Sequence, residues 1–442
     1  MLSIDHVPSS PTLPKRASAV VIGAGIAGIS TALELQARGL DVVVVEKGEV
    51  AAEQSSRNWG WCRQMGRDLR EIPLIKISLD LWRGMNAKIG AETGFRQCGI
   101  VYLNETEAAQ TERVEWVEKY ARPAGLSTRI LNNAEAAELV PGGITSFKGG
   151  IYTPDDGRAE PFISVPAMAK FFQSKGGVII THCAARGVEL SAGGVSSVVT
   201  EKGTVATDTV ILAGGYWSSR FLHNLGVRFP QLGVVTPVLR TSAIDIGHER
   251  TFAALKYAVR KRLDGGFTVA NGSVTVADLT PSHIRYALDF LPMLRMEYRS
   301  LRFHLGRRFL DELQIKRRWH FDEVTPFEAV RVLDPSPNNV TLDEAFEHLQ
   351  KSYPVFRNAQ VAERWAGMID GTPDAVPVID AINSVPGLFM LSGLSGHGFG
   401  LGPGAGRLMA EIALGERPCV DPSPFRFSRF SDGTRHKPTT GF

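Results

Sequence analysis

Residues 18–47 carry the feature that constrains the fold most. A short apolar run at 19–22 is followed by the sequence GAGIAG at 23–28, and then by apolar residues at helical spacing. A second apolar run, 42–45, ends at Glu46. A strand, a glycine-rich turn that opens a helix and a second strand closed by an acidic residue form a dinucleotide-binding βαβ unit. We therefore expect a doubly wound α/β domain that binds a dinucleotide.

Each glycine of this motif has its own purpose. Gly23 permits the tight turn, Gly25 lets the backbone approach the pyrophosphate, and Gly28 lets the helix lie close to the strand. The start of the helix then presents free N–H groups and a partial positive charge to the phosphates. Glu46 is expected to accept hydrogen bonds from a ribose.

Two further glycine-rich turns follow apolar strands later in the chain. The run at 204–219 ends its strand in Ala213-Gly214-Gly215. The run LSGLSGHGFGLGPGAGRL at 391–408 lies between a strand at 387–391 and a predicted helix at 405–414. Ligands of doubly wound sheets lie at the carboxyl ends of strands. Three such turns, spread over the whole chain, favour one long cofactor, and therefore FAD rather than NAD.

The stretch after the second strand, AAEQSSRNWGWC, also indicates a large ligand. Its small polar residues predict a loop that wraps the ligand instead of another regular βαβ unit. Ser55, Ser56 and Arg57 are within reach of phosphate oxygens, and Gly60 permits close approach to a ring. Trp59 and Trp61 flank that glycine.

The bulk composition is that of a globular enzyme. A chain of 442 residues favours two domains, and a formal net charge of +3 does not indicate a nucleic-acid partner. Four scattered cysteines, without metal-ligand spacing, are expected to be free thiols. The polar N-terminus has no apolar core of a signal peptide, and no apolar run is long enough to cross a membrane. We expect a cytoplasmic protein with a disordered lead and no metal.

The ordered motifs resemble the D-amino-acid-oxidase-like superfamily of FAD enzymes, which includes D-amino acid dehydrogenases, glycine oxidase and sarcosine oxidases. They are GAGIAGIS, EKG, SSRNWG, DDGRAEP, LAGGYWS, RWAGMIDGTPDAVPVID and SGHGFGLGPGAG. The resemblance implies a Rossmann-type, glutathione-reductase-like FAD domain and an α+β substrate domain whose antiparallel sheet roofs the flavin. The implied division is a disordered lead at 1–17, an FAD-binding domain at 18–95, 150–220 and 356–420, a substrate domain at 96–149 and 221–355, and a tail at 421–442.

The resemblance also implies which residues hold the cofactor. The ADP half lies against the first βαβ unit and a later strand, and the flavin lies against the closing glycine run. The expected cofactor-binding residues are Gly23, Gly25, Ile26, Ala27, Gly28, Glu46, Lys47, Ser55, Ser56, Arg57, Trp59, Gly60, Trp61, Ala185, Gly214, Gly215, Gly396, Gly398, Phe399, Gly400 and Leu401.

Two departures from relatives bear on cofactor and substrate. Relatives that bind flavin covalently use a cysteine before the TPD motif or a histidine in the early loop. Here Gly367 and Met368 stand in the first region and residues 53–63 contain no histidine, so we expect non-covalent FAD. Sarcosine-oxidase-like members have a lysine directly after GHGF, where this chain has Gly400, and sarcosine is therefore disfavoured as substrate.

Three side chains are candidates for the catalytic site. His397 lies within the flavin-facing loop, Arg63 follows the early loop, and Trp217 follows the second glycine turn. The segment 291–318 is arginine-rich and spaces its apolar residues as one helix face. Arg285, Arg295, Arg299 or Arg302 is expected to supply the cation that binds a substrate carboxylate, and 291–318 also suits docking of an electron acceptor or peripheral contact with anionic lipid.

The resemblance implies oxidation of a small-molecule amine. The expected reaction is FAD-dependent oxidative deamination of a D-amino acid or an N-substituted amino acid, by hydride transfer to flavin and hydrolysis of the imine. Oxygen, a quinone or a partner protein is the expected acceptor. The alternatives are the FAD subunit of a heteromeric opine-type dehydrogenase, and, outside enzymes, a non-catalytic flavin-binding protein.

Overall fold

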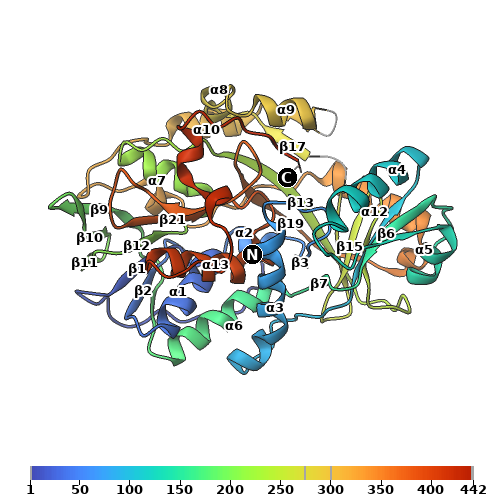
Figure 1. Cartoon of the computed structure of the whole chain (residues 1–442), viewed down its shortest axis with the longest axis horizontal. Helices are drawn as coiled ribbons and strands as arrows, with labels where there is room; N and C mark the ends of the chain where they lie inside the picture. The colour runs from blue at the N-terminus through green and yellow to red at the C-terminus, as the bar shows by residue number, and fades with distance from the viewer. Residues whose placement is uncertain (1, 273–274, 299–300, 440–442) are drawn as a thin grey trace.

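The computed structural model describes residues 2–272, 275–298 and 301–439, and two sheets organise them (Figure 1). The first is a six-stranded sheet in the order β20-β21-β12-β1-β2-β8, parallel except for β20. Its strands, in that order, are Val378–Ala381, Leu388–Ser392, Val210–Leu212, Ala19–Ile22, Val42–Val45 and Val178–Ile180. The predicted doubly wound sheet is therefore confirmed.

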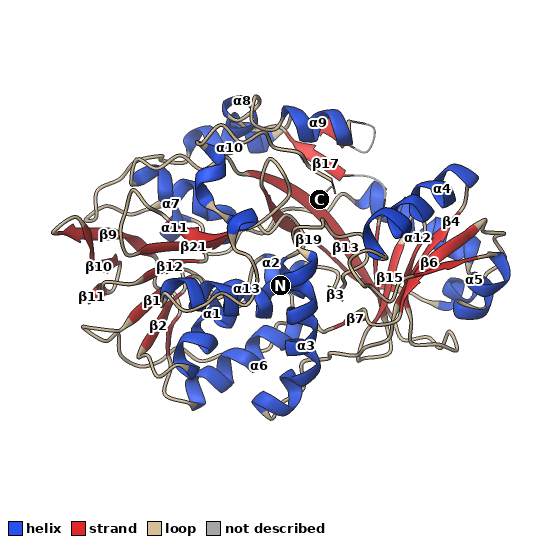
Figure 2. Cartoon of the chain, viewed as in Figure 1, coloured by secondary structure: helices blue, strands red, loops and turns tan. Residues whose placement is uncertain are grey.

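Both faces of this sheet are covered, which explains the uniformly apolar strands. Val21 and Val44 face the helices α1, α3, α6 and α13, while Val20 and Val43 face a second core that includes a small antiparallel sheet. Figure 2 shows these helices along one side of the sheet. They span Ile26–Ala37, Ile72–Ile89, Pro161–Ser174 and Gly398–Ala413, and the small sheet contains β9 Ala185–Ser191, β10 Gly194–Thr200 and β11 Gly203–Ala206.

The second large sheet has ten strands and is mostly antiparallel, as expected of the substrate domain. Its longest strands, β13 (Leu232–Thr241) and β19 (Val361–Gly371), pair along their length in the middle of the molecule (Figure 1). The others are β4 Ile100–Asn104, β5 Arg129–Leu131, β6 Gly149–Thr153, β14 Thr251–Ala253, β15 Ala258–Lys261, β16 Phe267–Ala270, β17 Thr275–Asp278 and β18 Leu301–His304.

The remaining elements are short or cover the edges of these sheets. They are α2 Gln54–Arg57, β3 Trp61–Cys62, α4 Glu107–Trp116, α5 Asn133–Leu139, β7 Gly157–Arg158, α7 Ser218–Asn224, α8 Pro281–Arg285, α9 Leu291–Glu297, α10 Arg307–Gln314, α11 Pro326–Ala329 and α12 Asn339–Ser352. No helix of the described ranges is both long and apolar enough to span a membrane.

The structure differs from the sequence expectation at the N-terminal lead. Backbone N–H groups of Asp5, Ser10 and Ala17 donate to carbonyl oxygens of the folded domain, and Val7 is only 2% exposed. The lead therefore lies along the surface instead of being disordered, because its backbone and one apolar side chain find partners. At the domain boundaries, β6 and β19 fall in ranges assigned to the FAD domain but pair within the larger sheet.

The expectation of one helix over 291–318 is wrong. The described part of that segment contains α9, the strand β18 and α10, while Arg299 lies outside the described residues. Backbone pairing of β18 with β17, which lies more than twenty residues earlier, overrides the local helical spacing. The apolar residues therefore do not share one buried face, and Leu294 and Leu305 are exposed.

The closing glycine run also differs from its prediction. Helix α13 begins at Gly398, seven residues before the predicted start, and passes through several glycines. A Cβ on Gly406 would lie 2.5 Å from the Cβ of Ser30 on α1, and one on Gly404 would lie 2.9 Å from the Cβ of Ser78 on α3. Glycine at these positions lets three helices cross closely, which compensates for its low helix propensity.

Candidate active site

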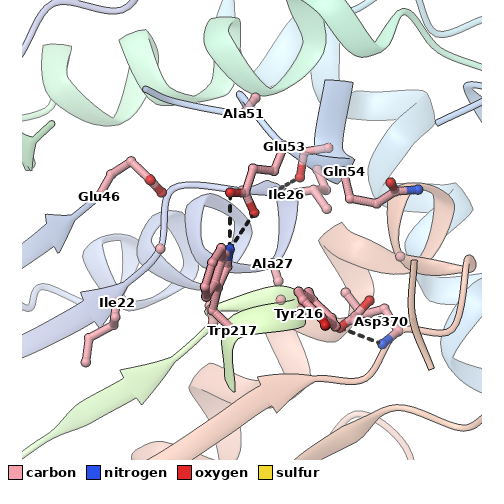
Figure 3. Close-up of a pocket in the computed structure, with 18 of the residues that line it drawn as sticks. Ile22, Ile26, Ala27, Glu46, Ala51, Glu53, Gln54, Tyr216, Trp217 and Asp370 are labelled. Carbon is pink, nitrogen blue, oxygen red and sulfur yellow. Dashed lines mark hydrogen bonds between the residues drawn. The ribbon is translucent and has the colours of Figure 1, made fainter. Parts of the chain in front are cut away.

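One elongated cavity, with about 1210 Å³ of open space, lies at the carboxyl ends of β1, β2, β12 and β21. Segments from all parts of the chain line it, as the three glycine turns predict (Figure 3). Of the expected cofactor and catalytic residues, those that line it are Gly23, Gly25, Ile26, Ala27, Glu46, Lys47, Ser55, Ala185, Gly214, Gly215, Trp217, Gly396, Gly398 and Phe399.

At one end of the cavity the backbone of the turn between β1 and α1 forms the cavity wall. Gly23 has φ +107°, and a Cβ there would lie 2.5 Å from the carbonyl oxygen of Ala213. The N–H of Ile26, at the start of α1, donates to Ser55 Oγ at 2.9 Å. Gly28 does not line the cavity; a Cβ on it would overlap the carbonyl oxygen of Gly23, so this glycine serves helix packing.

Glu46 presents a carboxylate at the same end. It accepts the N–H groups of Ala24 and Gly48, both at 2.8 Å. Burial raises the pKa of Glu46, and Lys47 together with these two N–H groups opposes that shift. Because a carboxylate has more acceptor sites than these two bonds use, Glu46 retains the capacity to accept ribose hydroxyls.

The ammonium group of Lys47 is occupied by protein partners. It lies 2.6 Å from a Glu53 carboxylate oxygen and donates to the carbonyls of Val330 and Arg331. It also lies 4.6 Å from the Trp217 ring centroid. Lys47 therefore supports the cavity wall through Trp217 and Glu53 instead of presenting a free cation.

Trp217 is itself fixed by Glu53. Its indole Nε1 donates to the Glu53 carboxylate at 3.0 Å, a contact drawn in Figure 3. The same carboxylate accepts the N–H of Leu333 at 2.9 Å. This arrangement makes Trp217 a rigid wall of the cavity. The indole N–H is occupied by Glu53, so we assign Trp217 no part in proton transfer.

Asp370 occupies the other end of the cavity, below the closing loop. Its carboxylate accepts the N–H groups of Gly393 at 2.7 Å and Leu394 at 3.3 Å. Burial raises the pKa of Asp370 to about 6, and these N–H groups oppose the shift. Asp370 thus holds the turn that leads to Gly396 and Gly398, whose backbones line the cavity.

Gln54 supplies an unused acceptor. Its Oε1 atom is buried against Gly367 of β19 without a hydrogen-bond partner among the described residues, and the residue lines the cavity (Figure 3). A buried orphan amide oxygen indicates a donor that belongs to a ligand. With the open glycine turns and Glu46, it makes the cavity fit a dinucleotide with a polar ring system.

His397 and Arg63 do not line the cavity. The ring of His397 is 3% exposed, and its Nδ1 lies 2.9 Å from the buried Glu71 carboxylate at the start of α3. Burial and Arg67 lower the pKa of His397 although Glu71 opposes them. Arg63 donates to the carbonyl of Met65. The His397 ring therefore faces the start of α3.

Part of the early loop also faces protein, although Gln54, Ser55 and Asn58 line the cavity. Arg57 pairs with Asp334 and donates to the carbonyl of Ala366 at 3.0 Å. The carbonyl of Gly400 accepts from Ser78 and Trp82, so the start of α13 is anchored to α3. The expected cofactor residues outside the cavity are Gly28, Ser56, Arg57, Trp59, Gly60, Trp61, Gly400 and Leu401.

A second, wider cleft of about 2680 Å³ adjoins the cavity and shares Tyr216 and Trp217 with it. Val235 and Pro237 of β13 form part of its wall. The Nη1 atom of Arg308 on α10 lies 3.2 Å from Asp278, and its Nη2 atom lies 3.8 Å from Met368 Sδ. Since Met368 lines the cofactor cavity, Arg308 stands where the two spaces meet.

Tyr216 stands at the same junction, with its hydroxyl 3.5 Å from a Glu312 carboxylate oxygen. Burial and Glu312 raise the pKa of Tyr216 to about 12, so its hydroxyl stays protonated. Of the four arginines expected to bind a carboxylate, Arg302 lines this cleft, Arg285 lines a separate small cavity, and Arg295 lies on α9. Glu53, Gln54, Tyr216, Arg308 and Asp370 were not among the expected site residues. Each nevertheless lies in or beside a segment that the sequence marked: Glu53 and Gln54 before Ser55, Tyr216 between Gly215 and Trp217, Asp370 in the RWAGMIDGTPD motif, and Arg308 in the arginine-rich segment 291–318.

A dinucleotide cavity at the ends of parallel strands, roofed by an antiparallel sheet, defines a two-domain flavoprotein oxidoreductase. Residues 18–412 match the family model described as FAD dependent oxidoreductase, and the chain belongs to this family. The cofactor is FAD, and the protein is an FAD-dependent oxidoreductase.

Among its relatives, the chain is 26% identical to glycine oxidase of Pseudomonas aeruginosa, over 92% of this chain and 97% of that protein. The structure resembles L-amino acid deaminase from Proteus myxofaciens in complex with anthranilate, with a TM-score of 0.93 and 33% identity over 97% of both chains. L-amino acid deaminase from Proteus vulgaris is similar at 32% identity and a TM-score of 0.92, over 96% of this chain and 100% of that chain.

Proposed function

We propose that this enzyme oxidatively deaminates L-α-amino acids with large side chains. The observation that carries the proposal is the wide cleft that joins the cofactor cavity at Tyr216 and Trp217. A substrate as small as glycine does not need such a space, whereas a bulky side chain fills it. The 33% identity and TM-score of 0.93 to an L-amino acid deaminase support the choice of the L series.

Arg308 is the group proposed to bind the substrate carboxylate. Its Nη2 atom faces the thioether of Met368, which is a weak acceptor, so this donor remains available for an oxygen ligand. Asp278 holds the other end of the guanidinium group at 3.2 Å and fixes its plane. A guanidinium fixed in this way recognises a carboxylate through charge-assisted hydrogen bonds.

The chemistry that FAD supplies when bound is acceptance of two electrons, as a hydride, from the α-carbon. The chain's own residues orient the substrate and exclude water: Arg308 would fix the carboxylate, and Val235 and Pro237 of β13 form part of the cleft wall. The amine must arrive neutral, because a protonated amine has no lone pair to stabilise the developing imine. Water then hydrolyses the imine to the keto acid and ammonia.

Two further features belong to the same proposal. FAD is held without a covalent bond, since no cysteine or histidine lines the cavity in the described part of the chain. The acceptor is a quinone or partner reached through the surface of α8 to α10, where Leu288 is 87% exposed and Leu305 is 68% exposed. This surface is also the proposed place of peripheral membrane contact.

A substrate series tests the proposal. We expect kcat/KM to rise from glycine through L-alanine to L-leucine and L-phenylalanine, because each added group fills more of the cleft. The rise should come mainly from a lower KM. Assays with a soluble quinone and with oxygen identify the acceptor. A preference for glycine, sarcosine or D-amino acids would overturn the proposed substrate class.

A further inference from the structure

A third and smaller cavity shares Tyr216 and Trp217 with the cofactor cavity. It contains about 450 Å³ of open space, against about 1210 Å³ in the cofactor cavity, so it has room for a small ion and not for another dinucleotide. Its lining comes from four places in the chain: α7 with the turn before it, Gln231 directly before β13, α8 with the residue after it, and the residues that follow α10. The reaction proposed above uses none of its polar groups.

The lining of this cavity is strongly cationic. Arg220 and His223 come from α7, Arg285 from the end of α8, and Arg317 from the segment after α10. Within the described ranges, none of the three arginines forms an ion pair with a carboxylate. Arg228, close to them in the chain, does have such a partner, with Asp289 at 2.6 Å. The cavity therefore brings together three guanidinium groups, with Arg285 and Arg317 exposed to solvent, and none of them has a carboxylate partner among the described residues.

Glu312 is the carboxylate that raises the pKa of Arg220 and Arg317, but it is hydrogen-bonded to other groups. It accepts from Ser282 and lies 3.5 Å from the Tyr216 hydroxyl. Its charge raises the pKa of Arg220 and Arg317 only in part. One carboxylate facing three guanidinium groups leaves the cavity with net positive charge.

The cationic groups lower one another's pKa. Burial and Arg285 lower the pKa of Arg220, and burial, Arg285 and Arg220 lower that of Arg317. Burial and the neighbouring arginines also lower the pKa of His223. Arg220 is nevertheless held in place, because its Nη1 donates to the carbonyls of Ile315 and Lys316 at 3.3 and 3.0 Å. A bound anion would remove this repulsion.

We propose that this cavity is a binding site for a phosphate group, either free or carried by a lipid headgroup. A doubly charged tetrahedral oxyanion matches several guanidinium groups that converge from different elements. The site is separate from Arg308 and from the proposed amino-acid substrate. The proposal therefore stands or fails independently of the substrate class.

Titration calorimetry of the FAD-loaded enzyme with inorganic phosphate, in chloride at constant ionic strength, tests the free-phosphate arm. We expect saturable binding, and Arg285→Ala or Arg317→Ala should each weaken it about tenfold, the loss of one charge-assisted hydrogen bond. Arg122→Ala is the matched control, since Arg122 is exposed, pairs with Glu118 and does not line the cavity. Arg308→Ala should also leave phosphate binding unchanged.

Vesicles distinguish the source of the phosphate. Sedimentation with phosphatidylcholine vesicles is compared with sedimentation with the same vesicles containing phosphatidic acid, for wild type, Arg285→Ala and Arg122→Ala. If the enzyme binds inorganic phosphate in solution and Arg285→Ala weakens that binding, the ligand is a soluble phosphate. Phosphatidic-acid-dependent sedimentation that the substitution abolishes, without free binding, supports a headgroup. The site would be overturned if the enzyme neither bound phosphate nor sedimented with phosphatidic acid vesicles. It would also be overturned if Arg122→Ala weakened binding as much as Arg285→Ala, or if only Arg308→Ala weakened it.

Discussion

Asp370 and His397 belong to neighbouring segments but face opposite ways. Asp370 faces the cavity and holds Gly393 and Leu394 by their N–H groups, while the ring of His397 faces Glu71 at the start of α3. A single histidine among glycines gives no sequence signal for that direction. The direction of the His397 ring follows from the start of α13 at Gly398, one residue after His397, and from the position of α3 beside that start.

Arg308 carries a prediction at this scale. Arg308→Ala should raise KM for the amino acid about tenfold to a hundredfold, because a charge-assisted hydrogen bond to the carboxylate is lost. Steady-state kinetics measure it, with FAD absorbance as the check on folding. Arg122→Ala is the control, since Arg122 is exposed, pairs with Glu118 and lies outside the cleft. Equal effects of the two substitutions would contradict the assignment of Arg308.

Asp156 carries a pH prediction. It is buried, accepts the N–H groups of Gln64 and Met65, and burial raises its pKa from 3.8 to about 7. Between these values the folded protein holds a proton that the unfolded chain releases, so this group lowers stability as pH rises. Tm of the wild type should therefore fall more steeply between pH 5 and 7 than Tm of Asp156→Asn. Parallel curves would show that Asp156 does not titrate in this range.

At the scale of elements, the turn between β1 and α1 shows how closely the backbone is packed. Gly28→Ala would place a Cβ against the Gly23 carbonyl oxygen. We expect this variant to lose about 1–3 kcal/mol of stability and to bind FAD poorly. Gly84→Ala is the matched control on α3: Gly84 is exposed and nothing lies within 4 Å of the added Cβ. That control should gain about 0.5–1 kcal/mol. Thermal melts with and without FAD measure both.

The local sequence pattern correctly predicted those elements whose pairing partners in the sheet lie close to them in the chain. β1 and β2 are continuous apolar runs joined by one helix, and their boundaries follow from the GAGIAG motif and Glu46. The segment 291–318 has helical spacing as well, but β18 pairs with β17 and local spacing does not show that pairing. The early start of α13 depends on close helix crossings that only the folded chain defines.

At the scale of the whole molecule, function depends on how the two sheets meet. β13 and β19 bring Val235, Pro237 and Met368 beside the spaces that the six-stranded sheet opens at its carboxyl edge. The family and the dinucleotide turns were accessible from the sequence. The substrate cleft was not, because α10, β13 and the loop after 324 meet only in three dimensions.

The most direct test of the account is the visible spectrum of the FAD-loaded enzyme without oxygen. Addition of L-phenylalanine should bleach the oxidised-flavin band, and D-phenylalanine, glycine and sarcosine at the same concentration should not. Later addition of a soluble quinone should restore the band. A spectrum that L-phenylalanine leaves unchanged, or that glycine bleaches equally well, would contradict the proposed reaction.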